Sequence, residues 1–182
     1  MKKYLISFIS TLSLVTLSAI QSPVFGWANG EGSAYAQGNM TGSLAFSFHH
    51  LGLYGAFDYG IHDCISAGAV IGYDGYSRLD ARYNHVPLMA RAAFHPFNLA
   101  ALADKIVIRD IVDVYAGITT GLLLIWIRRD NMTLEPVDYW EKTGFRIREY
   151  IGMRYTFADK WAFFVEDCGD VSTVAVGISY KF

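Results

Sequence analysis

The chain of 182 residues has few charged side chains, four prolines and only two cysteines. Charged residues make up 18% of the sequence, below the roughly 25% of an ordinary soluble domain, whereas hydrophobic residues make up 53%. This composition excludes intrinsic disorder, which needs low hydrophobicity and high net charge. The net charge of −2 lacks the basic footprint of a nucleic-acid-binding protein. Cys64 and Cys168 are too few for a disulfide framework and lack the clustered spacing of a zinc site.

The N-terminal 28 residues have the order of a secretory signal peptide. Lys2 and Lys3 precede an uncharged, mostly apolar run over residues 4–20. Small residues at positions 26 and 28 predict cleavage between residues 28 and 29, which we prefer to a second site between residues 36 and 37. An uncleaved anchor helix is the alternative, although the run is at the short edge of what a bilayer needs. We therefore expect a signal peptide over 1–28, a lead-in over 29–40 and one domain over 41–182.

Apolar residues alternate with small or polar ones through the rest of the chain. From Val174 to Phe182, each second residue is large and apolar. Side chains of a strand point alternately to opposite faces, so this pattern indicates one apolar face and one small or polar face. The pattern recurs over residues 44–48, 51–61, 65–73, 86–94, 112–126, 145–157 and 161–165.

Together these segments predict an all-β fold, an eight-stranded antiparallel transmembrane β-barrel with meander topology. The longest apolar run after the signal peptide, residues 117–127, is too short for a transmembrane helix, so a chain embedded in a membrane must cross as strands. Glu149 is the misfit, because its parity puts a carboxylate on the apolar face. We expect it above the bilayer or at a β-bulge.

The connections between the predicted strands are uneven. With the N-terminus on the periplasmic side, the turns on that side are residues 62–64, 95–110 and 158–160. Outer-membrane barrels have short periplasmic turns and longer outside loops, which 95–110 does not follow. Leu99, Leu102 and Ile106 lie there at helical spacing and predict one or two amphipathic turns. The outside connections are a link near residues 49–50, then 74–84, 128–142 and 169–170.

A soluble, lipocalin-like barrel would turn the same apolar stripes inward, and it remains an alternative. The membrane is favoured because the less apolar face is mostly small residues with scattered charges, and because the chain ends on phenylalanine. Aromatic residues also gather at strand ends, as in the girdles of transmembrane barrels. One end holds Tyr59, Phe94, Tyr155, Phe157, Trp161, Tyr180 and Phe182, and the other holds Tyr73 and Trp126.

Several segments of the predicted barrel resemble those of a known family. The terminal pattern of Val174, Val176, Ile178, Tyr180 and Phe182 resembles the assembly signal of Gram-negative outer-membrane proteins. Residues 53–73, 113–117, 152–157 and 163–166 are similar to strands of small OmpA-type outer membrane β-barrel sequences. The resemblance covers residues 41–182 and implies this fold, the outer membrane and recognition by the barrel-insertion machinery. It implies no activity, because the family is functionally mixed.

Catalytic chemistry is hard to find in the sequence. A serine hydrolase needs a base and an orienting acid within hydrogen-bond reach of the hydroxyl. The histidines all fall in or beside predicted turns rather than opposite a serine at matched depth, and no Gly-x-Ser-x-Gly elbow is present. His62, Asp63 and Cys64 crowd three metal-binding residue types into one turn without a fourth. We expect no enzyme, no cofactor and no metal. The serines considered are Ser43, Ser47, Ser66, Ser172 and Ser179, and the histidines are His49, His50, His62, His85 and His95.

Charged residues on the face opposite the apolar one should meet inside the barrel. An eight-stranded barrel has an interior just wide enough for side chains to fill, and isolated charges there are costly. They should therefore pair and close the channel, with Arg154 diagonal to Glu166 across the turn at 158–160. Lys181 and Asp113 are the members nearest to bulk water. The predicted cluster consists of Asp58, Arg91, Asp113, Arg154, Glu166 and Lys181.

The sequence thus predicts an exported, monomeric integral outer-membrane barrel with a filled lumen and a structural or surface-interaction role. Its expected partners are outer-membrane lipid, lipopolysaccharide and the insertion machinery, and not nucleic acid. Arg128 and Arg129 flank the loop 128–142, which carries aromatic and charged residues and would suit a surface partner or lipid phosphates. A lipid-modifying outer-membrane enzyme of the lipid A deacylase or acyltransferase class is the alternative in another functional class.

Overall fold

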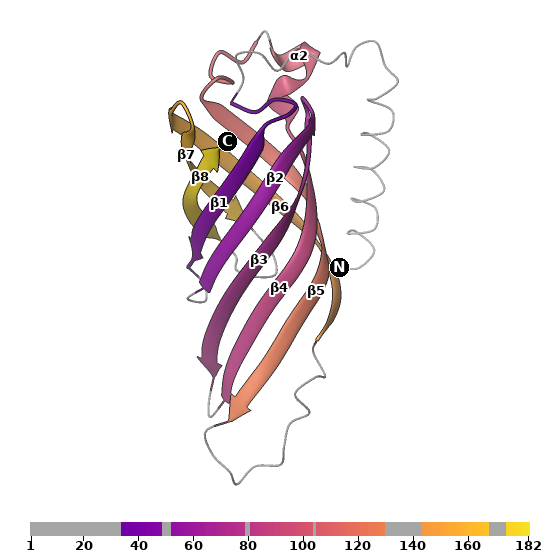
Figure 1. The fold of residues 1–182 in the computed structure, drawn as a ribbon, viewed down its shortest axis with the longest axis vertical. Helices are drawn as coiled ribbons and strands as arrows, with labels where there is room; N and C mark the ends of the chain where they lie inside the picture. The colour runs from indigo at the N-terminus through magenta and orange to yellow at the C-terminus, as the bar shows by residue number, and fades with distance from the viewer. Residues whose placement is uncertain (1–33, 49–51, 79–80, 104, 130–142, 168–173) are drawn as a thin grey trace.

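The computed structural model describes residues 34–48, 52–78, 81–103, 105–129, 143–167 and 174–182. Within them, eight antiparallel strands form a closed barrel in sequence order, and β1 pairs with β8 to close it (Figure 1). The predicted eight-stranded all-β meander is thereby confirmed. The predicted signal peptide, Cys168 and most of the loop 128–142 lie outside the described residues.

The strands differ in length, so the barrel wall is uneven. β3, β4 and β5 reach far beyond β7, β8 and β1 at one end of the barrel (Figure 1). The strands are β1 (Met40–Ser47), β2 (Gly52–His62), β3 (Ile65–Arg78), β4 (Ala81–Phe94), β5 (Val112–Arg129), β6 (Gly144–Ala158), β7 (Trp161–Asp167) and β8 (Ala175–Lys181).

The tall part of the wall corrects one prediction. We expected residues 74–84 to be a loop, but β3 continues to Arg78 and β4 begins at Ala81. Tyr76 pairs with Tyr83 in the register, and their rings stack with centroids 4.9 Å apart. Aromatic cross-strand pairs of this kind stabilise a hairpin. The segment reads as a loop because polar residues occupy both faces, which hides the period of two.

The two faces of the wall differ as the alternation predicts. Leu44 and Phe46 of β1 are 50% and 65% exposed, whereas Ala45 between them is buried. Each strand has an exposed apolar residue on its outer face. One example per strand, in chain order, is Leu44, Phe57, Ile71, Leu88, Ile118, Ile147, Phe163 and Ile178.

Glu149 stands on the outer face of β6 among these apolar residues. It is exposed and pairs with Ile118 in the register of β5 and β6. That register runs without a shift from Val112–Tyr155 to Leu123–Gly144, so the bulge that we offered as one explanation is wrong. Parity alone puts Glu149 outward.

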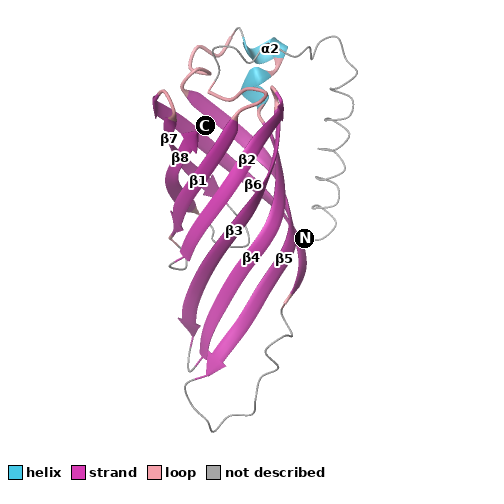
Figure 2. Ribbon diagram, viewed as in Figure 1, coloured by secondary structure: helices cyan, strands magenta, loops and turns pink. Residues whose placement is uncertain are grey.

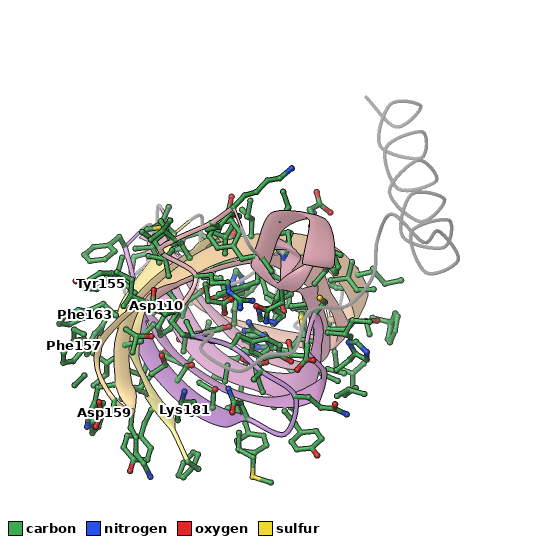
Figure 3. The ribbon with its side chains drawn as sticks, turned by 90° about the horizontal axis from the view of Figure 1, so that it is seen from above. Asp110, Tyr155, Phe157, Asp159, Phe163 and Lys181 are labelled. Carbon is green, nitrogen blue, oxygen red and sulfur yellow. The ribbon has the colours of Figure 1, made fainter. Side chains whose placement is uncertain are left out.

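Aromatic side chains form groups at both ends of the outer wall. Phe157 stacks on Phe163 with centroids 4.4 Å apart, and Trp161 contacts Tyr180 at 4.8 Å. Seen along the barrel, Tyr155, Phe157 and Phe163 point away from the wall (Figure 3). At the opposite end, Tyr73 and Trp126 lie 6.3 Å apart. Both groups are the ones predicted from the sequence.

We call the end at the top of Figure 1 the capped end; it holds residues 34–39 and the connections 63–64, 95–111 and 159–160. The predicted helical turns are present there, as the 3-10 helix η2 (Pro96–Asn98) and the short helix α2 (Ala100–Ala103) (Figure 2). Among the described residues, no helix has the length and apolar character to cross a membrane.

Candidate functional site

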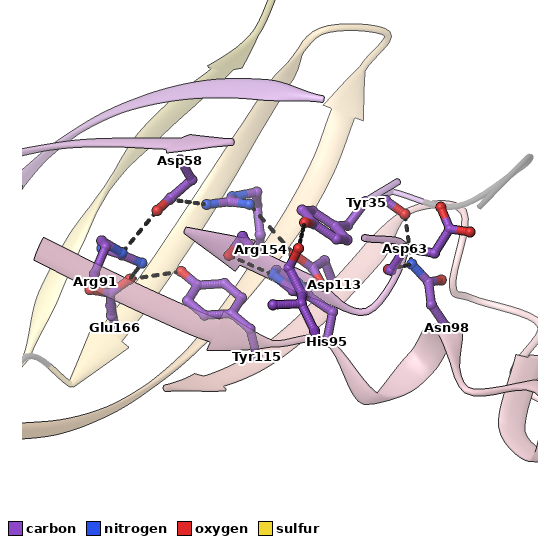
Figure 4. Close-up of polar contacts among 12 residues, drawn as sticks. Tyr35, Asp58, Asp63, Arg91, His95, Asn98, Asp113, Tyr115, Arg154 and Glu166 are labelled. Carbon is purple, nitrogen blue, oxygen red and sulfur yellow. Dashed lines mark hydrogen bonds and ion pairs between the residues drawn. The ribbon is translucent and has the colours of Figure 1, made fainter. Parts of the chain in front are cut away.

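A network of buried ions crosses the lumen, and its centre is Arg91 of β4 (Figure 4). Two nitrogens of its guanidinium reach Glu166 of β7, with Nη2–Oε2 at 2.9 Å and Nη1–Oε1 at 3.1 Å. Its Nε lies 3.0 Å from Oδ1 of Asp58 on β2. All three side chains are at least nine-tenths buried. One arginine therefore ties three strands together across the barrel.

Arg154 of β6 extends the network toward the capped end. Its Nη2 lies 3.7 Å from Oδ2 of Asp58, and its Nη1 lies 3.5 Å from Oδ2 of Asp113 on β5. Two arginines thus face three carboxylates in the buried interior. Such pairs are costly to bury and even more costly to break, because an unpaired partner is left behind.

Three tyrosines complete the network, and the sequence analysis assigned them no role. Tyr54 and Tyr115 donate to Glu166 at 2.6 and 2.9 Å, and Tyr150 accepts a hydrogen bond from Arg91 at 3.1 Å. Gly152 lies opposite Tyr115, and a Cβ there would sit 2.4 Å from its ring. Parity could have identified these tyrosines from the sequence, because they lie on the same inward face of their strands as the charged residues.

The structure brings together five of the six predicted lumen residues and leaves one apart. Lys181 is half-buried at the end of β8, and no ion pair within the described part of the chain includes it. Arg154 lies opposite Phe164, which makes Glu166 its diagonal neighbour as predicted, but the predicted ion pair between them is wrong because Glu166 turns across the lumen to Arg91. Glu166 pairs with Arg91 because Arg91 reaches it directly across the lumen. Arg154, its diagonal neighbour, lies two residues further along the wall.

The residues of the predicted assembly signal lie along β8 with the expected parity. Val174, Val176 and Ile178 are 39%, 36% and 41% exposed, and Tyr180 is half-buried. Phe182 is 68% exposed, and its backbone N–H donates to the carbonyl of Met40 at 2.9 Å. This side of β8 therefore faces away from the lumen.

A serine, a histidine and an aspartate form a hydrogen-bonded chain at the capped end of the lumen. Nδ1 of His95 lies 2.8 Å from Oδ1 of Asp113, and Nε2 lies 3.1 Å from Oγ of Ser66. All three are at least 97% buried. Because the carboxylate can only accept, Nδ1 carries the proton, and Nε2 of the neutral ring can accept from Ser66.

This chain contradicts our expectation that no histidine lies at hydrogen-bond distance from a serine. Ser66 is the second residue of β3 and pairs with Ala93 near the end of β4. His95 follows β4 directly, so its ring lies at the same depth as Ser66. Sequence reasoning missed the match because it treated a turn histidine as outside the barrel.

Residues 34–39 cover this chain. The Tyr35 ring stacks on His95 with centroids 3.6 Å apart and planes 1° from parallel (Figure 4). Its hydroxyl donates to the carbonyl of Ile65 at 2.7 Å, and Nδ2 of Asn98 donates to the Tyr35 carbonyl at 2.7 Å. Burial, followed by the nearby charges of Asp113 and Asp58, raises the pKa of the Tyr35 hydroxyl, which therefore stays neutral.

The turn of β2 and β3 holds no metal cluster. Cys64 is a buried free thiol, and His62 and Asp63 are half-buried. No group of three or more metal-binding side chains forms among the residues that the structure describes.

Comparison with family models gives no match, and comparison with curated proteins gives none either. Among solved structures, the outer membrane protein OprG of Pseudomonas aeruginosa is similar, with a TM-score of 0.50 and 11% identity over 81% of this chain and 97% of that one. Ail of Yersinia pestis, in a phospholipid nanodisc, has a TM-score of 0.45 and 9% sequence identity, over 80% of this chain and 100% of Ail. A de novo designed transmembrane β-barrel has a TM-score of 0.45 and 12% sequence identity, over 80% of this chain and 97% of the designed one. The likeness to OprG shows that this chain has the fold of an outer-membrane β-barrel.

Proposed function

We propose that the chain is an integral outer-membrane β-barrel of the small OmpA type, monomeric, with a closed lumen and a structural or surface-interaction role. The observation that carries the proposal is the inverted distribution of polarity in the wall. Buried ions and tyrosine hydroxyls share the interior with an apolar cluster that includes Met89 and Phe164, while the outer face of each strand presents large apolar side chains. Lipid is the environment that satisfies such an outer face.

A soluble lipocalin-like barrel would need the opposite arrangement, with apolar residues around a ligand cavity and polar ones outside. Here Phe46 is 65% exposed and Ile147 is 64% exposed, whereas Glu166 is 2% exposed. The apolar outer surface would be costly in water, at roughly 25 cal/mol for each Å². The exposed aromatic groups at both ends of the wall fit the two interfaces of a bilayer.

The tall wall of β3, β4 and β5 supports a role at the cell surface. With the capped end toward the periplasm, these strands project outward beyond the rest of the barrel (Figure 1). Arg82 is exposed near the start of β4, and the register pairs its position with Arg128 of β5. The guanidinium of Arg82 suits the phosphates of lipopolysaccharide, which we propose as a partner of this rim.

Residues 34–39, which cover His95 at the capped end, support signal-peptide cleavage between residues 28 and 29. Cleavage after residue 36 would remove Tyr35, which is 3% exposed and covers His95. Backbone hydrogen bonds from Ala34 to Arg109 and from Gly38 to Gly60 also fix this segment to the barrel. We therefore propose that residues 29–40 stay with the mature barrel as its lead-in.

Cell fractionation combined with heat-modifiability on a gel tests the proposed function. The protein should sediment with outer membranes after expression in a Gram-negative host, and the unboiled band should migrate differently from the boiled one. Recovery in the soluble periplasmic fraction, with the same migration before and after boiling, would overturn the proposal.

A further inference from the structure

We propose that Ser66, His95 and Asp113 form an acyl-transfer site at the capped end, with Ser66 as the nucleophile and a carboxylic ester as the substrate class. The distances of 3.1 Å from Ser66 Oγ to His95 Nε2 and 2.8 Å from His95 Nδ1 to Asp113 Oδ1 are those of an activated nucleophile. The arrangement is recognised by geometry and roles rather than by sequence order. It goes beyond the structural role proposed above.

The supporting contacts hold the histidine in the tautomer that the chemistry needs. Asp113 accepts from Nδ1, which leaves Nε2 free to take the serine proton. Arg154 lies on the other oxygen of the Asp113 carboxylate, with Nη1–Oδ2 at 3.5 Å, so a positive charge faces this carboxylate beside His95. The base therefore has an orienting acid that is itself fixed by the lumen network.

The reaction balances without any further group. Ser66 Oγ bonds to the ester carbonyl carbon as its proton passes to Nε2 of His95. The C–O bond to the alcohol then breaks, and the alcohol leaves with that proton. Water adds to the acyl-serine by the same route, which releases the carboxylic acid and restores the Ser66 hydroxyl.

Tyr35 controls access to the site. Its ring covers one face of His95, and its hydroxyl is bound at the start of β3. When residues 34–39 move aside, the space of one phenol ring opens against His95, beside Tyr115, whose ring centroid is 5.6 Å from that of His95. This space has aromatic walls, so it fits an aryl or short acyl group.

A fluorophosphonate probe tests the proposal on the folded, full-length mature protein. Ser66 Oγ would bond to phosphorus, fluoride would leave, and the serine proton would pass to His95. We expect a single adduct in the intact mass, mapped to Ser66 by peptide sequencing. Labelling should speed up several-fold in Tyr35→Ala and in Asn98→Ala, which removes the amide bound to the Tyr35 carbonyl.

The controls separate a nucleophile from a merely buried serine. Ser66→Ala should abolish labelling, and His95→Gln should slow it roughly 100-fold, the scale of one general base. Ser179→Ala should leave labelling unchanged, because Ser179 is equally buried at 2% and its Oγ has no hydrogen-bond partner within the described structure. Heat-modifiability verifies that each variant is folded. If folded Tyr35→Ala and Asn98→Ala both stay unlabelled at Ser66, the chain is structural only and the proposal is wrong.

Discussion

Arg91 and Glu166 join β4 to β7 across the lumen through two parallel contacts of 2.9 and 3.1 Å. Each contact uses a different nitrogen and a different oxygen, so the pair is fixed in orientation as well as distance. Glu166 also accepts from Tyr54 and Tyr115, which satisfies the carboxylate from further directions. This pair is the central contact of the buried ion network.

Replacing Glu166 by alanine should destabilise the barrel strongly. The change leaves Arg91 buried without its main partner, which costs about 3–5 kcal/mol in comparable buried pairs. The measurement is the urea midpoint of the barrel refolded in detergent, followed by tryptophan fluorescence. Asp159→Ala is the matched control, because Asp159 is an exposed acid in a turn and should shift the midpoint little.

The double variant Arg91→Met with Glu166→Leu should recover part of that loss, since apolar pairs often replace buried ions at no cost, while Asp58 keeps only Arg154 as its charged partner. A silent Glu166→Ala would contradict the assignment of this pair as the central contact of the lumen.

Cys64 should be a slow thiol in the folded barrel. Burial, followed by the charge of Asp63, raises the pKa of the Cys64 thiol to about 12. The thiolate is the reactive form, so alkylation by iodoacetamide should be slow at pH 8. The alkylation rate should increase about tenfold for each unit that the pH is raised toward that pKa. A Cys168→Ser variant isolates Cys64, and unfolding in urea should restore ordinary reactivity. Equal rates for folded and unfolded protein at pH 8 would show that the thiol is accessible.

The mature protein should begin at Asn29. Tyr35 fills the space over His95, so cleavage after residue 36 would expose a buried histidine at the capped end. N-terminal sequencing of the protein purified from outer membranes measures the site. A chain that starts at Gln37 or at Met1 would rule out the proposed lead-in.

Deletion of Phe182 should reduce assembly in cells more than stability in vitro. The side chain is 68% exposed, so little packing is lost with it. Its place in the terminal alternation resembles a signal for the insertion machinery. The amount inserted in cells should fall while refolding in detergent stays near that of the intact chain, and equal losses in both would point to packing instead.

The sequence predicts the wall of this barrel better than it predicts the interior. Period-two alternation depends on local spacing, so the outward positions of Phe46 and Ile178 follow directly from it. The predicted loop at 74–84 is wrong because Tyr76 and Tyr83 make their stacking contact only once the hairpin has formed. Local pattern carries no information about such pairing.

Parity identifies which residues face inward, but it does not say which of them meet. Arg91 and Glu166 are 75 residues apart, and their contact depends on the shear and closure of the whole barrel. The partnership of His95 with Ser66 depends on the pairing of β3 with β4, which brings the residue after β4 beside the start of β3. These contacts are tertiary, so a sequence can nominate the residues and not the pairs.

Conductance in planar bilayers is the most direct test of the central claim, a membrane barrel whose lumen is closed by buried ions. Because buried ions join strands across the lumen, we expect the refolded wild-type protein to insert without a large steady current. Glu166→Ala, if it inserts, should leak more than wild type. A stable, ohmic pore in the wild-type protein would contradict the account.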